Sequence, residues 1–234
     1  MIKIKSFGSS SKGNGYLIDD GQTQLLIECG IKLDKVKKEM NFDFSKVAGC
    51  FITHEHKDHC GYVEQLIKQT PVDVYATAGT LSMLNIDLYR QHALIMNYPK
   101  KVGTWKVTPF EINHDVVEPC GFIFENQVGE KLLFVTDTYY VKYRFKEITH
   151  LMVEMNYSKE IIKKNVSQEH YNKVLKSRVI ESHFEMENSL KFIESNMSNK
   201  LKEVWLLHLS ESNSNKKLFL EETQKLTGVP VYIA

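Results

Sequence analysis

One short segment of the chain gathers most of the side chains that could bind a metal ion. Three imidazoles and the carboxylate of an aspartate fall within six residues, His54-Glu55-His56-Lys57-Asp58-His59. Imidazole is the usual protein ligand of borderline divalent ions, and carboxylate suits harder ions and can bridge two of them. Alternation in an extended loop puts His54 and His56 on one side, where they suit one ion. Asp58 and His59 follow and can face a second ion, so the spacing predicts a metal site.

A metal site also needs ligands from elsewhere in the chain, and three candidates follow expected strands. His114 comes after the strand that ends near residue 112, Asp137 after the apolar run 132–136, and His208 after the apolar run 204–207. Each alone is commonly structural, because single histidines are often core or surface residues and aspartate often caps a turn. Their joint occurrence at strand ends favours a role as ligands.

The remaining histidines carry weaker signals. His183 stands in Glu181-Ser182-His183-Phe184, before a helix rich in acidic residues. It could donate a proton to a leaving group or bind a phosphate, and a helix-capping or surface role is the structural alternative. We predict that His92, His150 and His170 are structural.

The elements that must position these side chains follow from hydrophobic patterning. Strands are expected over residues 3–7, 16–19, 24–28, 47–53, 72–76, 104–112, 121–125, 131–135, 151–155, 204–209 and 229–233. Helices are expected over residues 31–40, 61–68, 77–90 and 216–226, with two or three more between 159 and 196. The order is strands, helices, strands, helices, strand, without a linker or a break in composition. This order predicts one layered domain over residues 1–234, with helices outside two packed sheets.

Composition excludes several classes of protein. The 234 residues are 42% hydrophobic and 25% charged, which is typical of a globular chain. Thirty Lys and Arg against 29 Asp and Glu leave a net charge of +1, so no overall field attracts a polyanion. The four cysteines form no CxxC pair, which excludes a zinc ribbon. The strand-like start lacks the apolar stretch of a signal peptide, and no run reaches about 18 apolar residues. We therefore expect a cytoplasmic protein without a membrane span.

Taken together, the motifs resemble those of a known superfamily. The segment His54–His59 is an HxHxDH motif, and the sequence resembles a metallo-β-lactamase superfamily hydrolase. His114, Asp137 and His208 match the later motifs, so the resemblance spans nearly the whole chain. Within the superfamily the chain is most similar to the YycJ-like (WalJ-like) branch, on the strings at residues 8–14, 114–122, 136–138 and 208–213. The resemblance implies an α+β fold, a four-layer αβ/βα sandwich with the metals at one edge.

The same resemblance implies which residue binds which ion. One divalent ion would take His54, His56 and His114. The other would take Asp58, His59 and His208, with Asp137 bridging the two. Asp58 and Asp137 would also help to position the attacking water. One position departs from the superfamily, which usually has aspartate after the third strand, where this chain has Glu28. Its carboxylate is expected to orient ligands by hydrogen bonds.

Such a site has a defined chemistry. Two divalent ions about 3.5–4 Å apart hold a bridging water and lower its pKa toward neutrality, which supplies a hydroxide nucleophile. A phosphodiester suits the site best, because its non-bridging oxygens can bridge both ions. The prediction is therefore an enzyme, a binuclear metal-dependent phosphodiesterase. The resemblance favours a sequence-nonspecific nuclease, an exonuclease, acting on DNA more than on RNA. Histidine favours Zn²⁺, and the mixed His and Asp set also suits Mn²⁺.

Other interpretations stay open. A hydrolase of a small substrate, such as a cyclic nucleotide, a thioester or a lactam, would use the same ions in a closed pocket. A non-catalytic metal-binding regulatory module is a second alternative, which the intact ligand set disfavours. Tyr139 and Tyr140 could stack a base, although packing is the simpler interpretation. Basic clusters could follow a phosphate backbone or form solvated faces, among them Lys142/Arg144/Lys146 and Lys173/Lys176/Arg178.

Overall fold

The N-terminal part of the chain forms most of the first of two compact units. The computed structural model describes residues 1–84, 89–166, 180 and 182–234, so His170 and the cluster Lys173/Lys176/Arg178 lie outside the described residues. The chain divides into two compact units. The first comprises Met1–Glu111 and Val116–Glu130, and the second Ile112–Asp115 and Lys131–Ala234.

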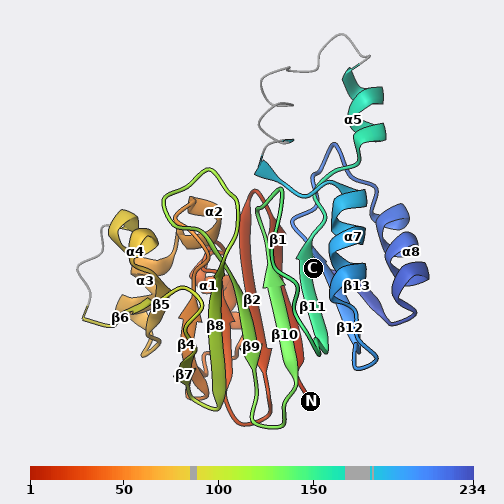
Figure 1. Cartoon of the computed structure of the whole chain (residues 1–234). Helices are drawn as coiled ribbons and strands as arrows, with labels where there is room; N and C mark the ends of the chain where they lie inside the picture. The colour runs from red at the N-terminus through yellow and green to blue at the C-terminus, as the bar shows by residue number, and fades with distance from the viewer. Residues whose placement is uncertain (85–88, 167–179, 181) are drawn as a thin grey trace. The chain divides into compact units, whose positions relative to one another are not determined.

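The first unit contains a six-stranded sheet whose strands follow one another in sequence order (Figure 1). The strands are β1 (Lys3–Ser10), β2 (Gly13–Asp19), β3 (Gln24–Ile27), β4 (Val47–Phe51), β5 (Val74–Thr77) and β6 (Gln91–Leu94). β1, β2 and β3 are antiparallel, whereas β3 to β6 are parallel. The short sequence of β4, Val-Ala-Gly-Cys-Phe, is almost wholly buried, as expected of an inner parallel strand.

The part of the first unit that the structure describes also contains four short helices and a small meander. The helices are α1 (Leu33–Glu39), α2 (Lys57–Cys60), α3 (Val63–Gln69) and α4 (Ala78–Leu84). α3 buries Val63, Leu66 and Ile67, the i, i+3, i+4 spacing of a helix with one apolar face. The antiparallel meander consists of β7 (Lys100–Val102), β8 (Trp105–Glu111) and β9 (Cys120–Glu125). Its large aromatic residues are fully buried, which anchors these strands in the core.

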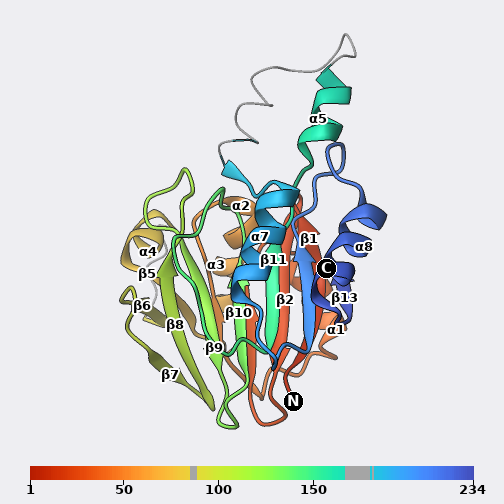
Figure 2. The ribbon, with the colours of Figure 1, turned by 45° about the vertical axis from the view of Figure 1, so that its right-hand side comes forward.

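The second unit contains four parallel strands. They are β10 (Lys131–Val135), β11 (His150–Glu154), β12 (Glu203–Leu207) and β13 (Val231–Ile233), which pair in that order. The helices among its described residues are α5 (Lys159–Val166), α7 (Met186–Asn196) and α8 (Lys216–Thr227). α7 contacts β11, and α8 contacts both α7 and β13 (Figure 2). All five residues of β11 are buried, so this strand forms the centre of the second unit's core.

The sequence predictions of strands and helices agree with most of these elements. Each of the eleven predicted strands is present, with bounds that differ by a few residues. Two strands were not predicted, β6 and β7. β6 lies where the helix predicted over 77–90 was expected to end, and α4 stops at Leu84 within the described residues. β6 is short and buries only Leu94, so its residues Gln-His-Ala-Leu carry no strand periodicity. One domain over residues 1–234 stays a prediction.

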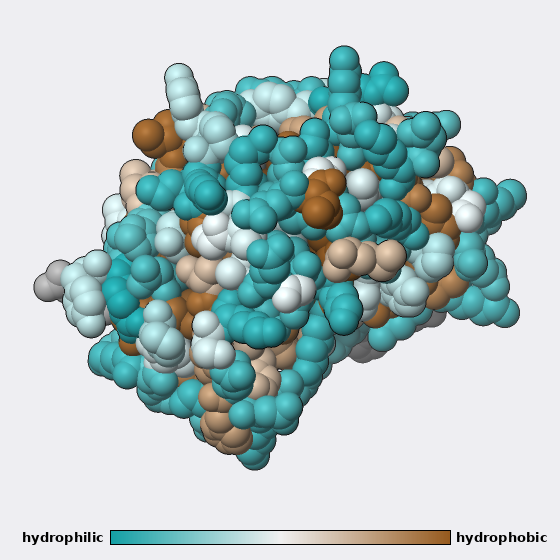
Figure 3. Space-filling view, turned by 90° about the horizontal axis from the view of Figure 1, so that it is seen from below, coloured by the Kyte–Doolittle hydropathy of each residue, from teal (hydrophilic) through white to brown (hydrophobic). Residues whose placement is uncertain are grey.

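The surface carries mainly polar side chains where it is visible. Figure 3 shows a face of mostly hydrophilic residues, with hydrophobic ones in small separate patches. Among the described residues, no helix is both long and apolar enough to cross a membrane.

Candidate metal centre

The loop that follows β4 carries the histidine-rich segment. β4 lies between the parallel strands β3 and β5 and ends at Phe51, so the segment leaves the sheet at the carboxyl end of an inner strand. His54 is fully buried, and His56 occupies the N-cap position of α2. Asp58 and His59 lie in the single turn of that helix. The carboxyl ends of parallel strands are the usual place for ligand-binding side chains in α/β proteins.

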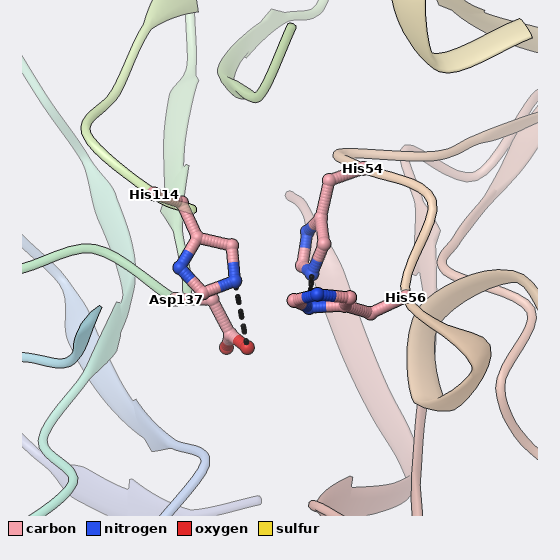
Figure 4. A group of neighbouring side chains, drawn as sticks. All are labelled: His54, His56, His114 and Asp137. Atoms are coloured by element: carbon pink, nitrogen blue, oxygen red, sulfur yellow. Dashed lines mark hydrogen bonds and ion pairs between the residues drawn. The ribbon is translucent and has the colours of Figure 1, made fainter. Parts of the chain in front are cut away.

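Hydrogen bonds within this loop fix the orientation of the first two histidines. The Thr53 hydroxyl donates to Oε1 of Glu28 at 2.5 Å and lies 2.8 Å from Nδ1 of His54. Because the hydroxyl proton goes to the carboxylate, the Thr53 oxygen accepts from Nδ1–H of His54. Nε2 of His54 then carries the lone pair that a metal needs, and it lies 3.2 Å from Nδ1 of His56 (Figure 4).

The same carboxylate contacts a third histidine of the loop. Oε1 of Glu28 lies 3.3 Å from Nδ1 of His59, and both side chains are fully buried. Nε2 of His59 in turn lies 3.3 Å from Oδ2 of Asp58. Burial raises the pKa of Glu28, although the neighbouring His59 opposes the shift. Glu28 therefore orients His54 through Thr53 and His59 directly, the role expected of the carboxylate at this position.

Asn14 ends the string at residues 8–14 but was not predicted as a site residue, and it supports Asp58 and His59. The Asn14 amide nitrogen lies 3.3 Å from Oδ2 of Asp58 and 3.1 Å from Nε2 of His59. Its oxygen accepts from the Tyr16 hydroxyl, which contacts the Ser9 hydroxyl at 2.6 Å. Asn14 is fully buried in β2. A polar residue inside a buried strand is the sequence signal that could have marked it.

In the second unit, candidate ligands stand at the ends of three adjacent parallel strands. Glu154 ends β11, His208 follows β12 directly, and Asp137 lies two residues after β10. The pairing of Val135 with Val153 and of Glu154 with Leu207 brings these strand ends to one edge. Glu154 was not predicted as a site residue. The sequence carries the same signal for Glu154 as for Asp137, namely an acidic residue at the end of an apolar strand.

Asp137 lies among the predicted ligands of the second unit. Its Oδ1 is 3.2 Å from Nδ1 of His208 and accepts from the Thr136 hydroxyl at 2.8 Å. Its Oδ2 is 4.0 Å from Nε2 of His114 (Figure 4). The side chains of Asp137, His114 and His208 are each at most 4% exposed. Such a buried carboxylate with two imidazoles beside it can share its oxygens between cations.

His183 forms a close pair with the unpredicted Glu154. Nδ1 of His183 lies 2.6 Å from Oε1 of Glu154, which also lies 3.2 Å from Nδ1 of His208. The other oxygen of Glu154 accepts backbone N–H groups of Thr138 and Phe184. Burial opposes the charged form of each partner, but their mutual attraction outweighs it. The pKa of His183 is therefore raised and that of Glu154 lowered, as in an ion pair.

Backbone strain marks three of these positions. Glu28, Asp137 and His208 adopt φ values of 64°, 45° and 52°, in the left-handed region that side chains with a Cβ rarely occupy. Each such residue costs on the order of 1–3 kcal/mol and clusters at functional sites. The left-handed backbone conformation turns each chain segment sharply after its strand and thereby sets the direction of the side chain.

The chemistry of the two donor sets fits divalent metal ions. In the first unit the set is His54, His56, Asp58 and His59. In the second unit Asp137, Glu154, His183 and His208 each offer a ligand atom within 4.8 Å of the others, with His114 beside Asp137. Buried imidazole nitrogens and carboxylate oxygens in such proximity are the donors that Zn²⁺ and Mn²⁺ take in proteins.

The histidines predicted to be structural have ordinary structural contacts where they are described. His92 in β6 stacks on Tyr75 with ring centroids 4.7 Å apart and contacts Asp73 at 3.1 Å. His150 is buried at the start of β11, with Nδ1 2.8 Å from the Thr149 hydroxyl.

Solved structures establish the fold of this protein. The metallo-β-lactamase fold protein YhfI from Bacillus subtilis superposes with a TM-score of 0.73 at 15% identity, covering 100% of this chain and 96% of its own. Zn²⁺-bound PqqB from Methylobacterium extorquens gives 0.72 at 13% identity, covering 100% and 97%. The chain has the metallo-β-lactamase fold, a mixed α/β fold with two sheets, as predicted.

Sequence relatives are more specific. The exodeoxyribonuclease WalJ of Streptococcus pneumoniae is 26% identical, covering 93% of this chain and 85% of the relative. The exodeoxyribonuclease YycJ of Bacillus anthracis is 26% identical, covering 93% and 86%. A family model described as anti-Pycsar protein Apyc1 matches residues 5–84. The predicted resemblance to the WalJ and YycJ branch is thus confirmed, and so is the prediction of a metal-dependent hydrolase.

Proposed function

We propose that this protein is a binuclear metal-dependent phosphodiesterase that acts as a sequence-nonspecific exonuclease on DNA. The observation that carries the proposal is the pair of buried His and carboxylate sets, on a chain that is similar to exodeoxyribonucleases over 93% of its length. Joining the two sets in one centre is part of the proposal. The first ion, Zn²⁺ or Mn²⁺, takes His54, His56 and His114. The second takes Asp58, His59 and His208, and Asp137 serves both.

The protein's own residues prepare this centre in definite ways. When bound, the two ions supply Lewis acidity and a water of lowered pKa. Glu28 accepts a hydrogen bond from the Thr53 hydroxyl and faces Nδ1 of His59, which leaves Nε2 of His54 and of His59 for a metal. Asp58 and Asp137 accept hydrogen bonds from the attacking water and so aim it at phosphorus.

His183 is the proposed proton donor to the leaving oxygen. Glu154 holds Nδ1 of its ring at 2.6 Å, which leaves the opposite ring nitrogen, Nε2, available to donate a proton. The side chain is 18% exposed, whereas that of Glu154 is fully buried. Glu154 is therefore a positioning residue that acts through His183.

Replacing His183 with asparagine should lower kcat in a manner that depends on the leaving group. An alkoxide leaving from DNA needs a proton, so we expect a loss of about 10²–10⁴-fold with an oligonucleotide. A p-nitrophenolate needs none, so hydrolysis of bis-p-nitrophenyl phosphate should change by less than about tenfold. Steady-state rates on both substrates check the prediction, with His92→Asn as the matched control. Equal losses on the two substrates would contradict a proton-donor role.

The function itself is tested with a panel of substrates. Purified protein loaded with Mn²⁺ or Zn²⁺ is incubated with end-labelled duplex DNA, single-stranded DNA, RNA and bis-p-nitrophenyl phosphate. The proposal expects stepwise shortening of DNA that falls steeply with salt, because phosphate contacts release counterions. Turnover of small esters alone, without salt dependence, would favour the small-substrate hydrolase instead. The proposal includes a preference for DNA and a cytoplasmic location, and the location rests on the sequence alone.

A further inference from the structure

The connection between β10 and β11 exposes aromatic and basic side chains directly after Asp137. Residues 138–146 read Thr-Tyr-Tyr-Val-Lys-Tyr-Arg-Phe-Lys, with four aromatic residues, three basic ones and no acid. We define this stretch as the aromatic-basic segment. Tyr139 and Tyr140 are 47% and 54% exposed, so about half of each side chain is open to solvent. Two exposed aromatic rings at consecutive positions, followed by a row of basic residues, make this segment a candidate binding surface.

The two tyrosines are fixed to the second unit's ligand set by the residue before them. Thr138 is fully buried, and its N–H donates to Oε2 of Glu154 at 3.1 Å. Its hydroxyl accepts the N–H groups of Asn113 and Tyr140, at 3.1 and 3.3 Å. The amide of Asn113 donates to the Tyr140 carbonyl at 3.2 Å. Asn113 precedes His114, so the backbone of the tyrosines is tied to the segment that carries this ligand.

The charges of the segment are turned outward. Along residues 141–146 exposure alternates: Lys142, Arg144 and Lys146 are exposed, whereas Tyr143 and Phe145 are half-buried. The half-buried rings pack together with centroids 6.1 Å apart. Arg144 donates through Nε to the Ser195 carbonyl at 2.6 Å, which anchors its side chain at the surface. The acid that follows, Glu147, contacts Lys200 at 2.6 Å, so its charge is neutralised locally.

We propose that the aromatic-basic segment binds a single nucleic-acid strand, whose bases stack on Tyr139 and Tyr140 while its phosphates contact Lys142 and Lys146. Exposed aromatic rings beside a row of cations are the combination that binds single strands without reading sequence, since every base has a flat face. Paired bases in a duplex hide those faces. This inference rests on the proposed function and deepens it: the strand that reaches the metals is unpaired.

The decisive comparison removes the bases and keeps the phosphates. Binding is measured by fluorescence anisotropy on the metal-loaded full chain, with labelled 12-residue phosphorothioate chains that resist cleavage. One chain carries thymine bases and the other is abasic. We expect the wild type to prefer the thymine chain by about tenfold or more. Tyr139→Leu/Tyr140→Leu should reduce this preference to less than about twofold, and Tyr139→Phe/Tyr140→Phe should keep it.

Two controls separate this result from general damage. Tyr232→Leu alters a tyrosine of similar exposure, 43%, paired with Trp205 in the adjacent strand, and should keep the wild-type preference. Lys142→Gln/Lys146→Gln should reduce the slope of log affinity against log salt concentration by about 1.4 for both nucleic-acid chains, at about 0.7 for each phosphate contact. The base preference should stay intact. An unchanged preference in the double-Leu variant, or equal binding of both chains by the wild type, overturns the inference. Failure to cleave any phosphodiester would instead refute the proposed function, because base preference is measured without cleavage.

Discussion

Replacing Asp137 with asparagine should abolish most of the phosphodiesterase activity, with a loss of about 10³-fold. Asparagine keeps the size of the side chain and tolerates the left-handed backbone found here, with φ at 45°. It removes the negative charge beside His208 and His114, at 3.2 and 4.0 Å, and replaces one oxygen by an NH₂ group that cannot bind a cation. A loss of 10³-fold corresponds to about 4 kcal/mol, the scale on which breaking a buried charge set is costly.

Two measurements check this expectation. The rate of bis-p-nitrophenyl phosphate hydrolysis reports the chemistry, and elemental analysis of the purified variant reports the metal content, which should fall below two ions per chain. Glu147→Gln is the matched control, because it alters an exposed acid in the same connection whose ion pair is worth little. Full metal content together with wild-type activity would show that Asp137 does not serve the ions.

The residues of the histidine-rich segment were predictable because the motif is local. Its ligands lie within six consecutive residues after a recognisable apolar strand, namely His54, His56, Asp58 and His59. Their spacing alone indicated metal binding. The strand ends at Asp137 and His208 were visible for the same reason. The contact between Asp137 and His208 at 3.2 Å was not predictable, because it depends on the register of β10, β11 and β12.

The roles of the supporting residues could not be assigned from the motifs, although Asn14 lies in the string at residues 8–14. Asn14 reaches Asp58 and His59 across 44 and 45 residues of sequence, and Glu154 reaches His183 across 29. Each is a buried polar residue in a largely apolar strand, where hydrophobic periodicity indicates the strand but not the role of the polar residue. A buried polar residue without a motif is therefore a prompt to look for the partner that satisfies it. The exposure of Tyr139 could not be predicted from the sequence either, because aromatic side chains usually pack against other residues.

Glycine at position 30 carries the largest expected effect on stability. A Cβ added to Gly30 would lie 1.6 Å from the Asp58 carbonyl oxygen and 2.9 Å from the Asn14 backbone nitrogen. Both neighbours are backbone atoms, which cannot move aside as a flexible side chain does. The segment is also tied in place, because Cys29 N–H donates to the His59 carbonyl at 2.6 Å. Gly30→Ala must push α2 away from β2, and with it Asp58 and His59.

We expect Gly30→Ala to destabilise the protein by about 3 kcal/mol, at the upper end for an overpacked site. At this chain length that corresponds to a fall in Tm of roughly 6–12 °C by circular dichroism. Gly129→Ala is the control: nothing lies within 4 Å of its added Cβ, and its φ of +79° alone should cost about 1–2 kcal/mol. Because the clash displaces Asp58 rather than the fold as a whole, metal content should fall in the fraction that still folds. Equal Tm values for the two variants would show that α2 can yield at Asp58, and that the close approach of these two backbones does not hold the ligands in place.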